Sequence, residues 1–552
     1  MMQNNKEIKM SVFRRDFLKL ASTGLAGAAT ASILTPGAQA APVSAGSGPG
    51  TVFNVRMYGA KGDGTTIDTP AINKAIDAAS TSGGGTVLFP AGVYACYSIH
   101  LKNNVALYLE MGSTILAADV PDNGVATGNC YDPAEPNTPW EDFQDYGHNH
   151  WHNSLIWGEG LQNIAILGPG LIWGKGLSRG SKKLPRAETP GIGNKSISLK
   201  NCHNVILRDF SILKGGHFGI LATGVDNLTI DNLKIDTDRD GMDIDCCRNV
   251  RVSNCSVNSP WDDAICPKSS YALGYARSTE NVTISNCYVT GAYALGTMLD
   301  GTWKPWVPDS DNKKPNGGTG RIKCGTESNG GFKNITITNC VFDGCHGFAL
   351  ETSDGAILED VTVTGLTMRN VNSAPIFLRL NARLRGPKET TQVGSLKRVI
   401  ISNVVCYNTD SKNIGGAIIS GIPGHMIEDI KLSDIYMHHT GGGTPEMAAK
   451  VEPEYLDAYP DPSGFGSLPA STFFVRHVKN IEFTNVEVAN AQPDARPIFI
   501  FDDVDGIDLF RIRTPKENGA PVFSLKGVHD FRIAASRAVK DTVLESADGK
   551  TL

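Results

Sequence analysis

The chain has 552 residues and a formal net charge of −6, a balance that speaks against a nucleic acid as its partner, because phosphate backbones select clustered positive charge. Beyond the first forty residues, no stretch of the sequence is apolar over the length that a membrane-spanning helix needs. Any acidic substrate must therefore meet a local basic patch on a chain that is acidic overall.

The first forty residues are predicted to be a twin-arginine signal peptide. Arg14 and Arg15 precede a mildly apolar run rich in alanine and glycine, which ends in the small-x-small cleavage pattern AQA at 38–40. This leader carries +3 of the net charge, so the remaining residues carry −9. We expect residues 1–40 to be removed on export to the periplasm or the outside, with residues 41–51 as a linker. A short membrane anchor is the alternative.

A repeating apolar pattern runs through the rest of the chain. Apolar residues recur at offsets 0, 2, 5 and 7, which describes two short strands, each with one buried face, joined by a bend. Such recurring strand pairs are typical of a solenoid, in which each coil buries its face by stacking on its neighbours. The sets are Leu228-Ile230-Leu233-Ile235, Val250-Val252-Cys255-Val257, Val282-Ile284-Cys287-Val289, Ile335-Ile337-Cys340-Phe342, Val361-Val363-Leu366-Met368, Ile430-Leu432-Ile435-Met437 and Ile481-Phe483-Val486-Val488.

The spacing of these sets predicts the size of a coil. Sets begin at Val205, Leu228 and Val250, so one coil takes 23 residues and the next takes 22. An asparagine, which tolerates the left-handed backbone of a tight bend, precedes the second strand at positions 232, 254, 286, 339 and 485. We predict an all-β fold, a single-stranded right-handed parallel β-helix over residues 52–535, with a C-terminal tail at 536–552.

Two further features belong to the fold prediction. Thr69 and Pro70 begin a helix of about ten residues, with proline at the first helical position, and this helix is expected to cap the open end of the solenoid. Cys255, Cys287 and Cys340 occupy an inward offset of the repeat, so we expect buried free thiols there. The pairing of Cys96, Cys130, Cys246 and Cys247 stays open.

Three aspartates are the candidate catalytic residues. Asp240 follows one strand pair by 5 residues, and Asp262 follows the next pair by 5, so they are expected to stack on adjacent coils about 4.8 Å apart. Together with Asp263 they crowd three carboxyls into one patch, where the pKa of one must rise and supply an acid. An inverting glycosidase needs a protonated and an ionised carboxyl roughly 6.5–9.5 Å apart, with a water between them. Solvated or calcium-binding acidic turns are the alternative.

The motifs around these aspartates resemble glycoside hydrolase family 28, which contains polygalacturonases and rhamnogalacturonan hydrolases. The matching residues around the aspartates are DGMD at 240–243, DDAI at 262–265 and Lys268. The repeat sequence ENVTISNCYV at 280–289 also resembles the family's repeats, and the stretch that begins at residue 52 resembles its N-terminal part. The resemblance implies an inverting hydrolase that uses no metal or other cofactor. It implies that Asp262 is the general acid and that Asp240 and Asp263 activate the water.

The chain departs from the family pattern on the coils that follow. Gly-His-Gly occurs nowhere, and Arg-Ile-Lys at 321–323 stands one coil earlier than in the family. Gly320 then takes the position of the family's histidine, and Ala-Leu-Glu at 349–351 takes the position of its Arg-Ile-Lys. These departures favour a variant substrate such as rhamnogalacturonan. His346 comes too late in the chain to be the missing histidine and is interpreted as structural.

Charged residues near the aspartates are candidates for substrate binding. Lys268, Arg321, Lys323 and Glu327 are the predicted substrate-binding residues, because a uronic acid carboxylate suits arginine and lysine. Solvated surface charge is the alternative. The basic run at 379–385 is expected to extend this positive surface.

Two insertions are expected to form walls beside the site. Residues 291–318 offer Trp303 and Trp306 as aromatic faces for sugars, and Asp300 is a further acid candidate. Residues 439–472 are expected to block one end, which favours attack at chain ends.

Three histidines alternate around a tryptophan in the irregular stretch 118–160. They are His148, His150 and His152 around Trp151. A surface loop is the preferred interpretation, followed by a wall of the site and then by a metal site. We predict no metal at the active site.

These features predict an exported, monomeric glycosidase. Its substrate is expected to be an acidic plant cell-wall polysaccharide or oligosaccharide that contains galacturonate, of the rhamnogalacturonan or polygalacturonate type. Two alternatives stay open: β-elimination of the pectate-lyase type, and a carbohydrate-binding solenoid without turnover.

Overall fold

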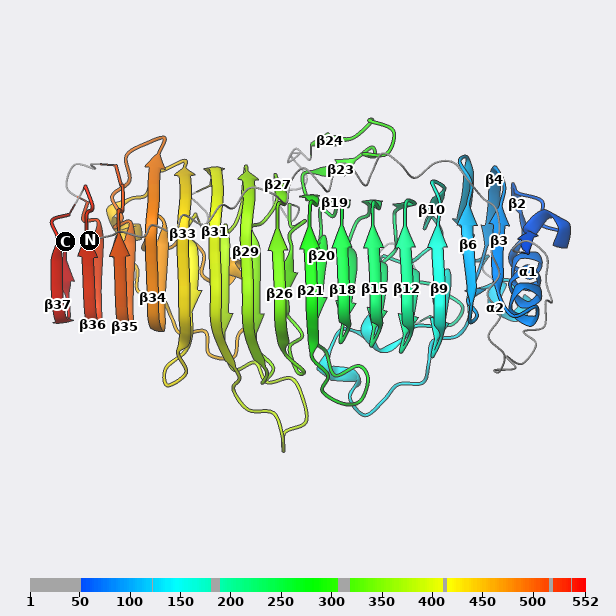
Figure 1. Cartoon of the computed structure of the whole chain (residues 1–552), viewed down its shortest axis with the longest axis horizontal. Coiled ribbons are helices and arrows are strands. Elements are labelled where there is room, and N and C mark those ends of the chain that lie inside the picture. The colour runs from blue at the N-terminus through cyan, green and yellow to red at the C-terminus, as the bar shows by residue number, and fades with distance from the viewer. Residues whose placement is uncertain are drawn as a thin grey trace, which may run out of the picture. The chain divides into compact units, whose positions relative to one another are not determined.

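The structure is a computed structural model that describes residues 51–552, except residues 122, 180–188, 306–317, 411–414, 516–519 and 538. The predicted leader therefore lies outside the described residues. From residue 51 onward the chain is a right-handed parallel β-helix, as the repeat predicts (Figure 1).

Each coil contributes up to three strands, which pair in parallel with their counterparts on the next coil. The first strands are β1 (Val52–Asn54), β3 (Gly85–Phe89), β6 (Val105–Leu109), β9 (Gln162–Leu167), β12 (His203–Arg208), β15 (Asp226–Asp231), β18 (Arg248–Ser253), β21 (Thr279–Ser285) and β26 (Phe332–Thr338). The second strands are β2 (Asp63–Ile67), β4 (Gly92–Cys96), β7 (Ser113–Ala117), β10 (Leu171–Trp173), β13 (Ser211–Leu213), β16 (Lys234–Asp236), β19 (Ser256–Asn258), β22 (Tyr288–Thr290) and β27 (Val341–Asp343).

The third strands form the sheet that carries the candidate site. They are β5 (Ile99–His100), β8 (Ile156–Glu159), β11 (Lys195–Lys200), β14 (Phe218–Thr223), β17 (Asp240–Asp245), β20 (Ile265–Lys268), β25 (Lys323–Cys324), β28 (Phe348–Thr352), β30 (Ile376–Leu380) and β32 (Ala417–Ser420). In the later coils, strands merge into the longer β29 (Ile357–Arg369), β31 (Ser395–Thr409), β33 (Ile427–His439), β34 (Phe473–Asn490), β35 (Phe499–Phe510) and β36 (Phe523–Ala534).

The bends between first and second strands have the predicted conformation. The asparagines at 232, 254, 286, 339 and 485 all have φ between 54° and 57°. This left-handed backbone is accessible to asparagine because its short polar side chain bonds locally. The local sequence therefore determines where each coil turns.

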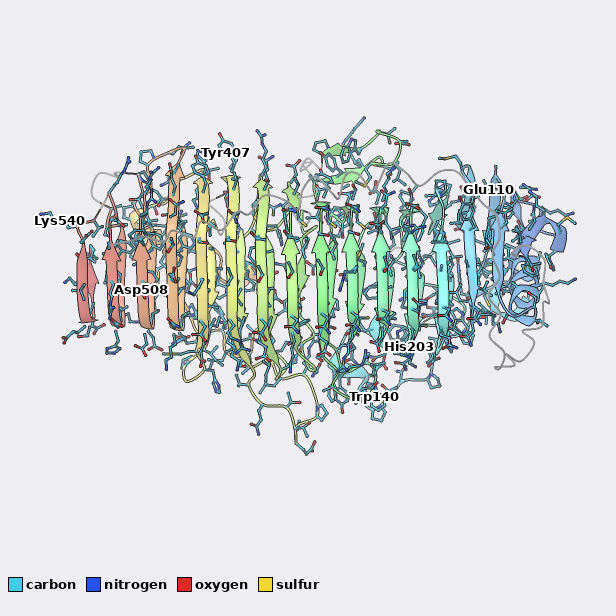
Figure 2. The ribbon with its side chains drawn as sticks, in the orientation of Figure 1. Glu110, Trp140, His203, Tyr407, Asp508 and Lys540 are labelled. Carbon is cyan, nitrogen blue, oxygen red and sulfur yellow. The ribbon has the colours of Figure 1, made fainter. Side chains whose placement is uncertain are left out.

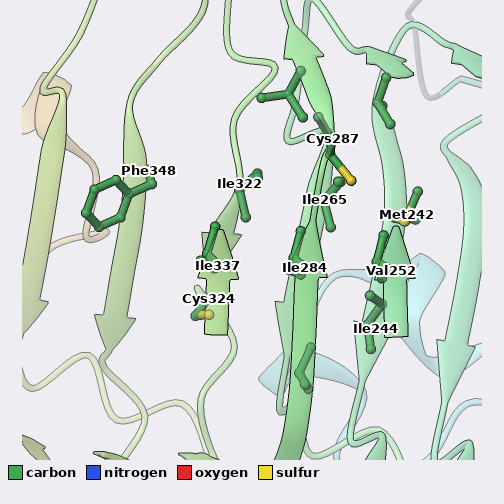
Figure 3. Packing of buried hydrophobic residues seen from close by; sticks show 14 of the residues in the cluster. Met242, Ile244, Val252, Ile265, Ile284, Cys287, Ile322, Cys324, Ile337 and Phe348 are labelled. Carbon is green, nitrogen blue, oxygen red and sulfur yellow. The ribbon is translucent and has the colours of Figure 1, made fainter. Parts of the chain in front are cut away.

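The core fills the inside of the coils. Met242 and Ile244 of β17, Ile265 of β20 and Ile322, directly before β25, belong to the core and are fully buried (Figure 3). Burial of each such side chain contributes about 1.5–3 kcal/mol. Because side chains alternate along a strand, the intervening residues of β17 and β20 face outward. All twelve cysteines are unpaired, and Cys255, Cys287 and Cys340 are buried, so the expectation of free thiols at these three positions is confirmed.

Helices and a terminal hairpin complete the described part. Helix α1 (Thr69–Thr81) begins where predicted and packs its buried face against β1 and β3 at one end of the stack (Figure 1). No described helix has the length and apolarity needed to cross a membrane. At the other end, β37 (Thr542–Ala547) and β38 (Lys550–Thr551) pair antiparallel with β36, so the predicted tail continues the sheet.

Candidate active site

Three aspartates gather on the outer side of the third-strand sheet. Asp240 begins β17, and Asp262 and Asp263 lie in the turn before β20. One carboxylate oxygen from each lies within 4.8 Å of the others. Asp240 and Asp263 are buried, whereas 25% of the Asp262 side chain is exposed. We call these three residues the carboxylate patch.

The strand register corrects the expected partner of Asp240. Strand β16 pairs with β19 at an offset of 22 residues, but β17 pairs with β20 at an offset of 23. Asp240 is therefore in register with Asp263 and not with Asp262, because the turn between β19 and β20 holds one extra residue. Gly241 donates its N–H to the Asp263 carbonyl at 2.9 Å. A Cβ at Gly241 would lie 2.4 Å from the carbonyl oxygen of Ala264, so this close approach requires glycine.

Burial and charge push the pKa values within the patch apart. Burial raises the pKa of Asp240 well above its usual value, and neighbouring carboxylates raise it further. Burial also acts to raise the pKa of Asp263, but the cations of Lys323 and Arg321 outweigh it and hold that pKa below its usual range. The patch thus combines a carboxyl that holds its proton more tightly than usual, Asp240, with one that stays ionised, Asp263, the combination that acid–base chemistry needs.

Asp262 has a partner that the sequence analysis did not single out. The Nη2 atom of Arg239 lies 2.8 Å from Oδ2 of Asp262. Arg239 directly precedes Asp240 in the chain, and this adjacency to a candidate catalytic residue was the one sequence signal that pointed to it. The partner of Asp262 is thus a cation that stands on the neighbouring coil.

The four predicted substrate-binding residues are buried in ion pairs, with at most 7% of each side chain exposed. Arg321 Nε and Lys323 Nζ lie 2.8 Å and 2.5 Å from the two carboxylate oxygens of Asp263. Lys268 Nζ lies 2.9 Å from Oε2 of Glu327. All four residues therefore lie beside the patch, and each forms an ion pair with an oppositely charged side chain of the protein.

The register supports the expected early position of the Arg-Ile-Lys motif. The bridge between β20 and segment 321–323 has an offset of 57 residues, which places Gly320 in register with Asp263. Strand β25 pairs with β28 at an offset of 26, which places His346 in register with Gly320. Burial, and then the charge of Arg321, lower the pKa of His346 to about 4, so its imidazole is neutral. His346 is therefore electrostatically coupled to the site.

Comparisons with known proteins agree with this arrangement. A family model described as rhamnogalacturonase A/epimerase, pectate lyase-like, matches residues 52–293. The exo-poly-alpha-D-galacturonosidase of Dickeya chrysanthemi is 33% identical over 183 residues, which make up 32% of this chain and 28% of that protein. The exopolygalacturonase of Platanus acerifolia is 23% identical over 434 residues, 74% of this chain and 96% of that protein. Over residues 52–293 the chain therefore resembles the pectate-lyase-like proteins of that family model, in line with its glycoside hydrolase family 28 motifs.

A solved structure supports the β-helical fold. The hyperthermoactive exopolygalacturonase of Thermotoga maritima superposes with a TM-score of 0.59 at 18% identity, over 80% of this chain and 93% of that one. At this identity the likeness concerns the fold.

Part of the second insertion covers the third-strand sheet beyond the patch, and we call residues 445–468 the strap. Phe465 and Leu468 of the strap pack in one apolar cluster with Phe377, Ile418 and Phe474 of the sheet. The strap contains α3 (Pro445–Ala448) and the 3-10 turn η4 (Pro462–Gly464). The insertion therefore covers the sheet at β30, β32 and β34.

Two buried arginines fix the strap by binding its backbone. Arg379 Nη2 donates to the carbonyls of Glu454 and Tyr455, both at 2.8 Å. Arg476 donates to the carbonyls of Glu452 at 2.8 Å and Pro453 at 2.7 Å. The guanidinium groups satisfy carbonyls that would otherwise be buried without a donor.

The expectation that residues 379–385 extend a positive surface is wrong for Arg379 and Arg383. Arg379 is 1% exposed because it binds the strap, and the side chain of Arg383 is buried and paired with Asp354. Arg385 Nη2 lies 3.1 Å from Glu327, but 34% of the Arg385 side chain stays exposed. Of the three arginines, Arg385 alone therefore adds charge to the surface.

The strap also reaches the patch. Asp461 Oδ2 lies 3.2 Å from Arg321 Nη2, while Nε of the same arginine binds Asp263. Neighbouring Tyr459 accepts a hydrogen bond from Thr326 Oγ1 at 3.0 Å. No local sequence pattern connects Asp461 with the patch, since the two lie far apart in the chain.

Each histidine of the alternating run has a carboxylate partner of its own. His148 Nε2 lies 3.0 Å from Asp243, and His150 Nε2 lies 2.9 Å from Glu141. His152 Nε2 lies 3.5 Å from Glu135 and 3.0 Å from Glu159. The three histidines therefore do not converge, whereas His148 joins the site through Asp243, a contact that the sequence analysis missed.

The first insertion forms a hairpin above the strands (Figure 1). Strands β23 (Tyr293–Leu295) and β24 (Lys304–Pro305) pair antiparallel, and Trp303 stacks on Tyr293 with ring centroids 3.9 Å apart. The Asp300 carboxylate accepts hydrogen bonds from Thr302 within its own turn. Trp306 lies outside the described residues.

Proposed function

We propose that the chain is an exported O-glycosyl hydrolase that cleaves a galacturonate-containing pectic polysaccharide or oligosaccharide, of the polygalacturonate or rhamnogalacturonan type. The observation that carries this proposal is the carboxylate patch, in which one carboxyl with a raised pKa stands beside one whose pKa is lowered. Two family relatives with activity names, an exo-poly-alpha-D-galacturonosidase and an exopolygalacturonase, support the substrate class.

In the proposed mechanism, Asp262 protonates the glycosidic oxygen as the bond to the anomeric carbon breaks. Asp263 and Asp240 position a water and accept its proton as the new carbon–oxygen bond forms. The exposure of Asp262 supports its role as the acid, because it is the patch carboxyl that a substrate meets first. The charges of Lys268, Arg321, Lys323 and Glu327 are proposed to hold these carboxylates in place below the substrate.

The strap supports attack at a chain end. It covers the sheet from β30 onward and contacts Arg321 at the border of the patch. A polysaccharide lying along the sheet would meet the strap directly after the patch. We therefore propose that the enzyme releases short products from one end of its substrate.

Replacement of Asp262 by asparagine tests the hydrolase proposal. Reducing-sugar release from polygalacturonate and rhamnogalacturonan should fall at least about 10³-fold, because the proton donor is lost. The matched control is Asp508→Asn on a distant coil (Figure 2), which should leave release unchanged. A product with ultraviolet absorbance would instead indicate β-elimination, and carbohydrate binding without any release by the wild type would indicate a non-catalytic solenoid.

A further inference from the structure

The cations around the patch differ sharply in exposure. The side chains of Lys323 and Arg321 are each 4% exposed, and both are bound to Asp263. Lys268 is 7% exposed and bound to Glu327. Arg239 differs, because 34% of its side chain is exposed while its guanidinium contacts the patch. Among these four cations, Arg239 is the one that a ligand can reach from solvent.

The guanidinium of Arg239 is only partly used inside the protein. Its Nη2 donates to Asp262 at 2.8 Å, but its Nε is buried and, among the described residues, has no hydrogen-bond partner. Asp240 and Asp145 also act on Arg239, and Asp145 is held by His217 at 2.8 Å. Because Nε is buried, an acceptor from solvent can reach the guanidinium only on its Nη side, in competition with Asp262.

We propose that Arg239 binds the carboxylate of a uronic acid residue of the substrate and that this binding releases Asp262 to act as the general acid. The inference rests on the proposed hydrolase function and adds the group that selects an acidic sugar. A planar guanidinium can hold a sugar carboxylate through two parallel hydrogen bonds, which the single contact with Asp262 does not use.

This exchange also explains how the proton reaches Asp262. In the free protein burial makes Asp240 hold a proton more tightly than an ordinary carboxyl does, while Asp262 is paired with Arg239. When the substrate carboxylate takes over Arg239, the carboxyl of Asp262 is released from this ion pair and can meet the glycosidic oxygen. The proton leaves Asp240 for Asp262 and passes from there to the glycosidic oxygen, so that Asp240 becomes the carboxylate that assists the water.

A neutral sugar at the same position cannot compete with Asp262 for Arg239. The acid would then stay in its ion pair, and cleavage would be slow even where the substrate binds. Selection of acidic sugars would therefore appear in the turnover rate as well as in the affinity.

The test compares trigalacturonate with its carboxyl-reduced form, which keeps the linkage but lacks the charge. For Arg239→Gln, kcat/KM on trigalacturonate should fall about 10- to 100-fold, which is the loss expected when one hydrogen bond to a charged group is removed. On the reduced substrate it should rise above the wild type, because Asp262 is no longer held in an ion pair with Arg239. Arg248→Gln is the control, since Arg248 is 40% exposed and paired with Glu280 at 3.2 Å, and it should preserve the preference for the acid.

A binding measurement separates this inference from hydrolysis. In Asp262→Asn, where Arg239 has lost its internal carboxylate, calorimetry should give tighter binding of trigalacturonate than in the Asp262→Asn, Arg239→Gln double variant, again by about 10- to 100-fold. Equal affinities, or an Arg239→Gln enzyme that still prefers the acidic trimer, would overturn the role of Arg239 while leaving the hydrolase proposal intact. Failure of the wild type to cleave either trimer would count against the hydrolase proposal, and the calorimetry would still decide the binding role.

Discussion

Arg321 binds Asp263 through Nε at 2.8 Å, and both side chains are almost completely buried. The other end of the same guanidinium reaches Asp461 of the strap at 3.2 Å. An element from a remote part of the chain thereby helps to orient one of the two cations that hold the pKa of Asp263 low, Lys323 first and Arg321 second.

Asp461→Asn should lower kcat/KM about tenfold, which corresponds to about 1.4 kcal/mol. Without the charge of Asp461, Arg321 is held less firmly against Asp263, so the loss should appear mainly in kcat. Steady-state kinetics on polygalacturonate measure it. Asp457→Asn, an exposed position on the same strap, is the control, and equal activity of the two variants would show that the contact has no part in catalysis.

Asp240→Asn should abolish activity and yet stabilise the protein at neutral pH by about 0.5–2 kcal/mol. The pKa of Asp240 is raised in the folded state, so the folded protein binds this proton more tightly than the unfolded chain does. Wild-type stability therefore falls as the pH rises through the folded-state pKa, and the variant escapes this loss. Thermal melts at pH 5 and pH 8 should show a gain in Tm that grows with pH; a gain independent of pH would contradict the assignment.

Glu351→Gln should flatten the pH dependence of stability. Glu351 is fully buried, neither of its carboxylate oxygens has a hydrogen-bond partner among the described residues, and burial raises its pKa from 4.5 to about 7. The folded state again holds the proton more tightly, so this carboxyl removes about 3 kcal/mol of wild-type stability as the pH rises from below 4.5 to above 7. Urea unfolding of both proteins across this range measures the difference, and parallel curves would count against the raised pKa.

Arg379→Met should loosen the strap and change the pattern of products. The carbonyls of Glu454 and Tyr455 lose their donor, so we expect a destabilisation of about 1–3 kcal/mol. Chromatography of early digests should show one short product with the wild type and a spread of intermediate sizes with the variant. The control is Arg398→Met, which alters an exposed ion pair; a spread of sizes with the wild type itself would argue against attack at chain ends.

The anomeric form of the first product tests the inverting mechanism that the family resemblance implies. The patch oxygens lie within 4.8 Å of one another, closer than the roughly 6.5–9.5 Å that is typical of inverting pairs. We nevertheless expect inversion, with the water held between Asp263 and Asp240. Proton NMR early in the reaction distinguishes the two anomers, and net retention would require a covalent intermediate on one of the aspartates.

Most of the fold could be predicted from patterns that extend over a few neighbouring residues. The offsets of the apolar residues and the asparagines at the bends describe local strand geometry, which the backbone obeys wherever it occurs. The same regularity brought Asp240 near Asp262 and Asp263 before any coordinates were considered. The position of Arg-Ile-Lys one coil early also followed from counting residues along the repeat.

Other features of the site depend on contacts that no local pattern encodes. The turn before β20 holds one extra residue, so Asp240 is in register with Asp263 and not with Asp262. Strand pairing depends on turn geometry as well as on the period of the sequence. Arg379 is buried because the strap lies over it, and Asp461 meets Arg321 because that same strap folds back across the sheet. A solenoid repeat specifies stacking between neighbouring coils, whereas the placement of a long insertion is decided by packing and ion pairing between distant segments, which exist only once the chain has folded.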